Sequence, residues 1–241
     1  MPELFHLPGF HEPFSAISHL TGAVVFAFLG SLLLARGAGD GARLTLLAIY
    51  VVSCVTLFAL SGVFHMMVNG GTAHFVMGRL DQGAIFVFIA GTFTPLHGIL
   101  FRGLLRWGPL VFVWAAAILG IVMQAVFPAQ FAGWLGVALY LALGWFGAFS
   151  GTVLARRYGW RFIKPLVWGG IAYSIGAIIH SLNTLVVLPG VIHPHEVFHV
   201  AVLAGAYFHW QFIWGFAAGA PRVSPREKAQ GNQTAAPCTT S

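Results

Sequence analysis

From residue 44 to residue 67 the chain reads LTLLAIYVVSCVTLFALSGVFHMM, with no lysine, arginine, aspartate or glutamate. An α-helix needs about 20 apolar residues in succession to cross the roughly 30 Å hydrocarbon core of a bilayer. The whole chain has the same character, because 58% of its residues are hydrophobic, 7% are charged and the mean hydropathy is +0.84. A soluble domain carries about 25% charged residues. The composition therefore excludes an ordinary soluble domain and indicates a membrane protein.

Apolar blocks of similar length recur along the chain and predict an all-α polytopic membrane protein, a seven-transmembrane-helix bundle or barrel. The blocks are too long for transmembrane strands and lack the alternation of strands. The predicted membrane domain covers residues 1–220, and the polar residues 221–241 are expected to form a disordered tail. The predicted spans are approximately residues 15–35, 44–67, 81–101, 109–127, 131–154, 165–188 and 195–218.

Positive charge is divided unequally between the two ends of these spans. Of the twelve lysines and arginines, eleven fall on the side of the connections that follow spans 1, 3, 5 and 7, and Arg79 alone falls on the other side. Cytoplasmic loops are enriched in lysine and arginine. We therefore expect the N-terminus outside and the C-terminus in the cytoplasm, most simply in a bacterial inner membrane. The basic residues are spread over the loops, a distribution that does not indicate nucleic-acid binding.

Several ionisable side chains lie at membrane depth, where they are costly and usually functional. Ser61 and His65, near the end of span 2, are spaced i, i+4 and share one helical face. Asp81 starts span 3, and His195 and His199, again spaced i, i+4, start span 7. Because successive spans alternate in direction, all five residues are expected at the same membrane face.

This set of residues favours a metal site. Three neutral imidazoles from two helices, with a water molecule, make the usual tetrahedral shell of a catalytic zinc ion. A nearby carboxylate can accept a proton from that water. Histidines also occur at helix ends without metal, where they cap the helix or face headgroups, and this chain has 11 histidines. That simpler explanation is preferred for an isolated histidine, but less so for a pair accompanied by a third histidine and an aspartate.

The chain resembles the hemolysin III family, within the larger superfamily of progestin and adiponectin receptors (PAQR) and alkaline ceramidases. The resemblance extends from Glu12 to about Phe216 and depends on short motifs that occur in the family's order. These are Glu12 with Ser18–Gly22 (SHLTG), Ser61–His65 (SGVFH), Asp81 with Ile89–Pro95 (IAGTFTP), Tyr140–Trp145 (YLALGW), Gly169–Gly176 (GGIAYSIG), and His195, His199 and His209.

The resemblance implies a seven-helix barrel in which His65, His195 and His199 bind zinc. It implies that Asp81 orients or deprotonates the water, and that Ser61 supports the site or helps to hold a developing oxyanion. Enzymes of the superfamily hydrolyse amide bonds in lipids such as ceramide, so the expected partners are membrane lipids and a ceramide-like amide substrate. One departure concerns orientation: adiponectin receptors are similar in having the metal near the N-terminal face, which is cytoplasmic there, whereas the arginines here place that face outside.

Two other functions compete with a lipid hydrolase. Residues 195–199 also match His-Glu-x-x-His, the zinc metalloprotease motif in which Glu196 would be the general base. Some intramembrane proteases have this motif within a span and bind the zinc with a further carboxylate from a distant Asp-Gly type segment. No such segment is evident in this sequence. Alternatively, the zinc is structural, with Asp81 or His193 as a fourth ligand, and the protein is a receptor, sensor or cytolytic protein without catalysis.

The remaining histidines have weaker signals. We expect His19 and His209 to form polar ties between helices rather than to bind metal, with Glu12 near His19. His97 is interpreted as a loop or interface residue, and we assign no role to His180.

Overall fold

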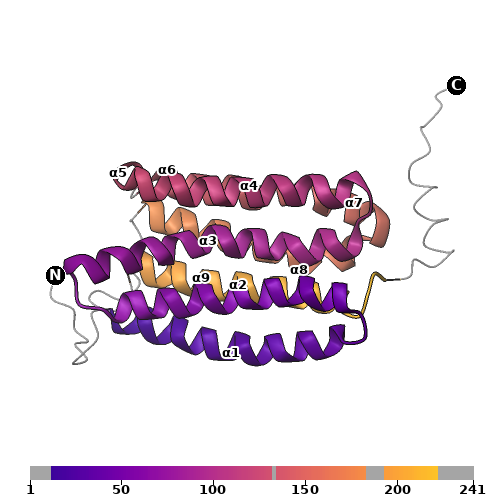
Figure 1. Ribbon diagram of the computed structural model, residues 1–241, viewed down its shortest axis with the longest axis horizontal. Helices are drawn as coiled ribbons and strands as arrows, with labels where there is room; N and C mark the ends of the chain where they lie inside the picture. The colour runs from indigo at the N-terminus through magenta and orange to yellow at the C-terminus, as the bar shows by residue number, and fades with distance from the viewer. Residues whose placement is uncertain (1–11, 132–133, 183–192, 222–241) are drawn as a thin grey trace, which may run out of the picture.

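The protein is an all-helical bundle in the computed structural model, which describes residues 12–131, 134–182 and 193–221 (Figure 1). Within these residues there are no strands, and most helices are long enough to span a bilayer. The helices are α1 (Pro13–Gly37), α2 (Gly41–Met66), α3 (Gly71–Leu100), α4 (Leu104–Val126), α5 (Pro128–Phe131), α6 (Trp134–Trp145), α7 (Gly147–Tyr158), α8 (Trp160–Leu182) and α9 (Pro194–Trp214).

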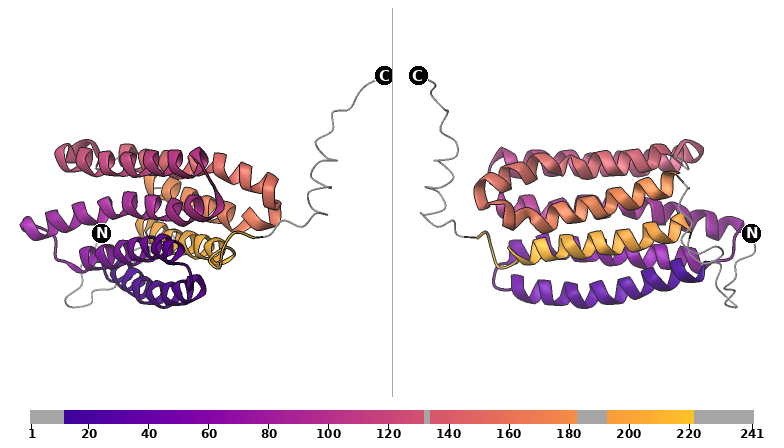
Figure 2. Two further views of the ribbon diagram at one scale, coloured as in Figure 1. Left: turned by 45° about the vertical axis from the view of Figure 1, so that its right-hand side comes forward. Right: turned by 180° about the vertical axis from the view of Figure 1, so that it is seen from behind.

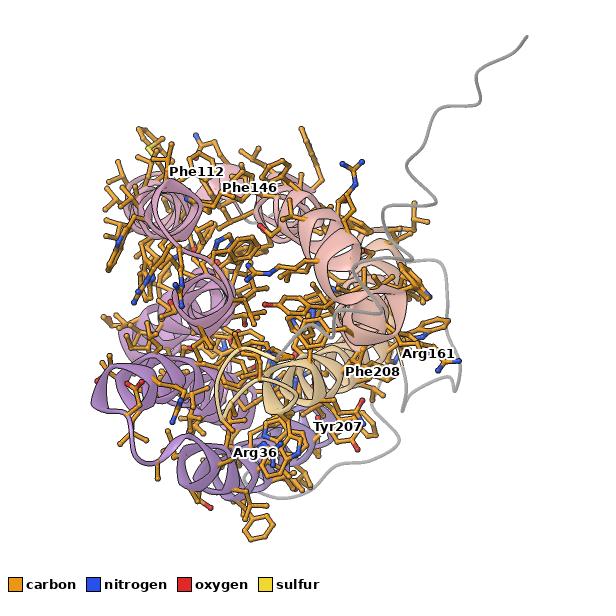
Figure 3. The ribbon with its side chains drawn as sticks, turned by 90° about the vertical axis from the view of Figure 1, so that its right-hand side faces the viewer. Arg36, Phe112, Phe146, Arg161, Tyr207 and Phe208 are labelled. Atoms are coloured by element: carbon orange, nitrogen blue, oxygen red, sulfur yellow. The ribbon has the colours of Figure 1, made fainter. Side chains whose placement is uncertain are left out.

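The long helices run alternately in opposite directions along the bundle (Figure 1), and the end-on view in Figure 3 shows them arranged in a ring. In ring order α1 packs on α2, α2 on α3, α3 on α4, α6 and α7 on α8, and α8 on α9, which returns to α1. The rear view in Figure 2 shows α9 between α8 and α1. This alternation brings the end of α2 and the starts of α3 and α9 to one end of the bundle (Figure 1).

Six segments of the described chain are long and apolar enough to cross a membrane, namely α1 to α4, Trp134–Tyr158 and α8. Helix α9 is 21 residues long but includes three histidines, a glutamate and a glutamine, and it is not among the six. It nevertheless packs in line with its neighbours along the bundle. With α9 as the seventh helix, the fold is that of the predicted polytopic membrane protein.

The helix ends differ from the predicted spans in three places. Helix α3 starts at Gly71 rather than near residue 81, so its first turns protrude beyond the bundle (Figure 1). The predicted span 131–154 is divided at Phe146 into α6 and α7. The long connection expected before Pro165 is reduced to Gly159, whose φ of +86° suits glycine and separates α7 from α8. Residues 183–188 of the sixth predicted span and residues 222–241 of the predicted tail lie outside the described residues.

The fourth and sixth predicted spans start at Pro109 and Pro165, but the structure places both prolines inside helices, in α4 and α8. Pro109 lies inside α4 and has no N–H to donate to the carbonyl of Leu105. The Nδ1 atom of His97 donates to that carbonyl at 2.8 Å, and its Nε2 atom lies 3.0 Å from Ser150 Oγ. His97 is 1% exposed. The interpretation of His97 as a loop or interface residue is therefore wrong, because it is a buried tie between α3, α4 and α7.

Close packing fixes α1 against α2 near the site. A Cβ atom on Gly62 would lie 2.6 Å from Leu20 Cγ and 2.9 Å from the Leu20 backbone nitrogen. Real Cβ atoms do not approach a backbone this closely, so glycine is what allows the contact. The start of α1 is thus held directly beside the last turns of α2, which carry Ser61 and His65.

Candidate metal centre

Three imidazole rings from two helices converge at one end of the bundle. His65 lies in the last turn of α2, and His195 and His199 lie one turn apart at the start of α9. The Nε2 atom of His195 is 3.4 Å from that of His65 and 3.0 Å from that of His199. His65 and His199 are buried, whereas the side chain of His195 is 34% exposed. The cluster therefore has a closed side and an open side.

The spacing of these nitrogens fits a zinc ion. Zinc–nitrogen bonds of about 2.0–2.1 Å at tetrahedral angles place two ligand nitrogens about 3.3–3.4 Å apart. The observed separation of 3.4 Å matches that value and the separation of 3.0 Å is slightly shorter, and one ligand atom from each of the three residues lies within 4.8 Å of the others. Among the residues that the structure describes, Asp81 and His193 are not part of this set. The arrangement can hold a metal ion with three protein ligands.

The hydrogen-bonding capacity of the three imidazole rings also favours a bound metal ion. A neutral imidazole has one N–H group and one lone pair. The Nδ1 atom of His65 donates to Glu12 Oε2, which leaves the lone pair on Nε2. His195 Nε2 faces both other Nε2 atoms but can supply one proton to one well-aligned hydrogen bond. One of the two short contacts is then not a regular hydrogen bond, so the donor set fits a cation better than it fits a hydrogen-bonded trio.

The structure places Asp81 and Ser61 beside the cluster. Asp81 lies about three turns into α3 rather than at its start. Its carboxyl group is close to the Ser61 hydroxyl and interacts electrostatically with His65. Ser61 is buried one turn before His65 in α2. All five residues predicted for the site are therefore together, three as possible ligands and two beside them.

Two further residues approach the cluster from α1. Glu12 contacts His65 directly, with Oε2 2.5 Å from Nδ1. His19 stacks on the His199 ring at 3.9 Å between centroids, and its Nε2 atom lies 3.5 Å from the His199 carbonyl oxygen. The motif that contains both residues was recognised in the sequence, but it did not show that Glu12 contacts His65. Glu12 lies at the start of the first span, on the predicted face of the histidines, and that position was the available signal.

Glu196 has a structural role at the start of α9. Its Oε2 atom accepts a hydrogen bond from the His193 backbone N–H at 2.9 Å, and its Oε1 atom accepts one from Ser15 at 3.5 Å. This is the reach of a glutamate at the third position of a helix back to the N-cap residue. The carboxylate is thereby occupied in capping α9, although it falls at the position of the general base in the metalloprotease motif.

The other histidines lie around the centre or away from it. His209 lies 3.3 Å from the Leu166 carbonyl oxygen and ties α9 to α8, as expected. His180 of α8 packs beside the open side of the cluster, with its ring 5.2 Å from that of His195. It is the nearest ring from α8 to a proposed ligand in the described part of the chain.

An all-α polytopic membrane protein with a histidine cluster near one membrane face is the class that the fold and the site define. The chain matches the family described as haemolysin-III related over residues 9–210, and it belongs to that family. It is 29% identical to Hemolysin-3 of Bacillus cereus over 194 residues, which cover 80% of this chain and 85% of the relative. It is 28% identical to the Hemolysin-3 homolog of Bacillus subtilis over 194 residues, 80% of this chain and 87% of the relative. It is also 24% identical to the human Monocyte to macrophage differentiation factor over 202 residues, 82% of this chain and 81% of the relative.

Proposed function

We propose that the protein is a zinc-dependent hydrolase of lipid amide bonds. The observation that carries the proposal is the convergence of three histidine Nε2 atoms with a carboxylic acid beside them that is not among the ligands. Structural zinc sites are usually closed by four protein ligands, whereas catalytic sites have three and leave one position for water or substrate. In the part of the chain that the structure describes, the set has three members.

The chain's own residues supply the acid–base chemistry. A zinc ion bound by the histidines supplies Lewis acidity and makes water acidic near neutral pH. Asp81 accepts the proton of the attacking water, whose oxygen bonds to the amide carbon, and returns the proton to the nitrogen as the carbon–nitrogen bond breaks. Ser61 interacts with the Asp81 carboxyl and orients it. Of the two roles expected for Ser61, this contact favours support of the aspartate over binding of the oxyanion.

The proposed substrate is a ceramide-like amide lipid of the surrounding membrane. The cluster lies near the ends of membrane-spanning helices, at a depth that an amide bond next to a headgroup reaches. The open side of the cluster at His195 gives such a bond a route to the metal position. The amide specificity is carried over from the alkaline ceramidases that the chain resembles. From the distribution of arginines, we expect the end of the bundle that carries the cluster to face the extracytoplasmic side of the membrane.

A structural zinc in a non-enzymatic protein is the second candidate. The ligands come from α2 and α9, which lie on different sides of α1 in the ring order, so a metal would join two helices that have few other contacts. The metalloprotease alternative has less support, because the Glu196 carboxylate is engaged in capping α9.

Metal analysis of the purified full chain tests the site. We expect about one zinc ion per chain in the wild type, lost in His65→Ala and in His199→Ala and retained in His74→Ala. His74 is a suitable control because its ring packs on Phe64 and is not part of the cluster. Wild-type protein without zinc would overturn the proposal.

Activity then separates the two candidates. Zinc-loaded wild type is incubated with a ceramide, and release of the fatty acid is measured against the two histidine variants. We expect hydrolysis in the wild type and in His74→Ala alone. Bound zinc without hydrolysis of ceramides or related N-acyl lipids would favour the structural zinc.

A further inference from the structure

Glu12 is connected to the last turn of α2 by two bonds. Its backbone N–H donates to the His65 carbonyl oxygen at 3.0 Å, and its carboxylate Oε2 accepts from His65 Nδ1 at 2.5 Å. The first bond satisfies one of the carbonyl groups that lack a partner at the end of a helix. Both bonds end on the same residue, so Glu12 fixes the backbone and the ring of His65 together.

The local sequence explains how Glu12 reaches α2. Pro13 starts α1, and the residue before a proline is disfavoured in helical conformation. Glu12 accordingly has φ −124° and ψ 82° and leaves the line of the helix. The close approach of Gly62 to Leu20 holds the start of α1 against α2. The side chain of Glu12 is 34% exposed, so its carboxylate stays partly hydrated beside a buried ring.

The contact determines which nitrogen of His65 is free. Because the carboxylate accepts the Nδ1 proton, the lone pair is on Nε2, the atom that faces His195. In many metal sites a carboxylate holds a histidine ligand in this way and raises its basicity. By contrast, the Nδ1 atom of His199 is buried and has no hydrogen-bond partner within the described residues.

The charge of Glu12 also suits a bound cation. Its Oε2 atom lies 3.8 Å from His195 Nε2, so the negative charge is near two of the three proposed ligands. Three neutral imidazoles contribute no charge to offset a divalent ion, and an uncompensated charge at membrane depth is costly. The carboxylate is nevertheless not part of the set of ligand atoms that lie within 4.8 Å of one another.

We propose that Glu12 is the positioning residue of the metal centre, which holds His65 with its Nε2 lone pair toward the ion and offsets part of the ion's charge. This role rests on the proposed zinc site. It assigns to Glu12, the N-cap residue of α1, a function in metal binding that acts through His65 and not as a ligand.

Zinc affinity of the full chain, measured by competition with a chromophoric chelator, tests the role. Glu12→Gln keeps the backbone bond and the size of the side chain but removes the charge, and we expect about 10- to 100-fold weaker binding. The matched control is Glu196→Gln at the same end of the bundle, where glutamine can still cap α9. Its affinity is expected to stay within about threefold of the wild type.

A second measurement separates positioning from general damage to the fold. Glu12→Asp keeps the charge on a shorter side chain, so its affinity should fall between those of the wild type and Glu12→Gln. Cobalt(II) replaces zinc as a spectroscopic probe, and its visible spectrum is expected to change in Glu12→Gln and to return toward the wild type in Glu12→Asp. Thermal unfolding of each variant in chelator checks that the metal-free protein is folded.

The outcomes are distinct. If Glu12→Gln binds zinc within about threefold of Glu196→Gln, the role of Glu12 is overturned while the zinc site stands. If the wild type binds no zinc, the proposed function itself fails. If Glu12→Gln does not fold, Glu12→Asp decides, because an affinity and a cobalt spectrum equal to the wild type would overturn the role and a measurable loss in both would support it.

Discussion

Three carboxylic acids lie near the histidines, and each has different neighbours. Asp81 interacts with Ser61 and with His65, Glu12 accepts the Nδ1 proton of His65, and Glu196 caps α9. A general base must reach the reacting water, whereas a positioning group must contact a ligand from its far side. Because Glu12 and Glu196 are engaged in these contacts, we propose Asp81 as the general base.

Exchanging Asp81 for asparagine tests that assignment. Asparagine keeps the shape of the side chain and cannot accept the proton, so ceramide hydrolysis should fall by about 100- to 10,000-fold. Zinc content should stay at the wild-type level, because Asp81 is not among the possible ligands. Fatty-acid release and metal content are measured on the same preparation.

Glu196→Gln is the matched control for Asp81→Asn. We expect its hydrolysis rate to equal the wild type, because the cap of α9 is retained. A metalloprotease that used the His-Glu-x-x-His motif would give the reverse result. Full activity in Asp81→Asn, or loss of its zinc, would refute the assignment of Asp81.

Among the helices, the contact between α1 and α2 supports the site most directly. The approach of Gly62 to Leu20 brings the start of α1 to the end of α2, and the Glu12–His65 bonds lie at that junction. Close contact through glycine is a common way to pack helices within a bilayer, where van der Waals contact replaces the hydrophobic effect. Any group added at Gly62 must push these two helices apart.

Gly62→Ala is expected to destabilise the bundle by about 1–3 kcal/mol, the usual cost of overpacking. Part of the clash is with the Leu20 backbone nitrogen at 2.9 Å. The double variant Gly62→Ala with Leu20→Ala should therefore remain below the wild type in thermal unfolding. Gly170→Ala in α8 is the control, because no atom outside its chain neighbours and the adjoining helix backbone lies within 4 Å of the added Cβ, and it should be about 0.5–1 kcal/mol more stable. Equal stability of both alanine variants would contradict the packing argument.

The sequence predicted the membrane helices and their alternating directions better than it predicted where each helix starts and ends. Hydropathy measures the apolar length of a segment, so it could not show that α3 already begins at Gly71, ahead of His74 and Arg79. Pro109 indicated a loop because its missing N–H usually ends a helix, but His97 contacts the carbonyl that Pro109 leaves unbonded. That compensation depends on a side chain from α3, which local sequence patterns do not reveal.

For the site, helical spacing and alternating direction were enough to bring His65, His195 and His199 to one end. The partner of Glu12 was not predictable in the same way. Whether Glu12 meets His19 of its own helix or His65 of α2 depends on the rotation of α1 about its axis, which the packing of Gly62 on Leu20 fixes.

Across the whole molecule, the two ends of the bundle differ in chemistry. The cluster of His65, His195 and His199 occupies one end, and arginines bond to the last carbonyl groups of three helices at the other. Arg43 donates to the Gly37 and Ala38 carbonyls after α1, Arg36 to Trp214 of α9, and Arg157 to Leu100 of α3. Basic side chains at helix C-termini are favourable because they offset the negative end of the helix dipole.

Capping of helix ends explains the position of some of these arginines, but it does not explain the whole excess of basic residues at one end of the bundle. No hydrogen bond to a helix end is found for Arg102, Arg156, Arg161 or Lys164 in the described part of the chain, and Arg161 points away from the bundle in Figure 3. Even without the three capping arginines, the end opposite the histidines keeps several basic residues, against Arg79 at the histidine end. We therefore still expect, from the positive-inside rule, that this end faces the cytoplasm.

Reporter fusions test this orientation on the full membrane domain. A fluorescent protein that matures only in the cytoplasm should be bright when fused after Ala220, and a phosphatase that is active only outside should be inactive there. The same two reporters inserted after Asn69, in the connection between α2 and α3, should give the opposite pair of results. This is expected because Ala220 follows α9 at the arginine end, whereas Asn69 lies at the histidine end, and an odd number of spans separates the two positions. A phosphatase active at Ala220 would place the histidine cluster on the cytoplasmic side, as in the adiponectin receptors, and the proposed substrate would then have to come from the inner leaflet of the membrane.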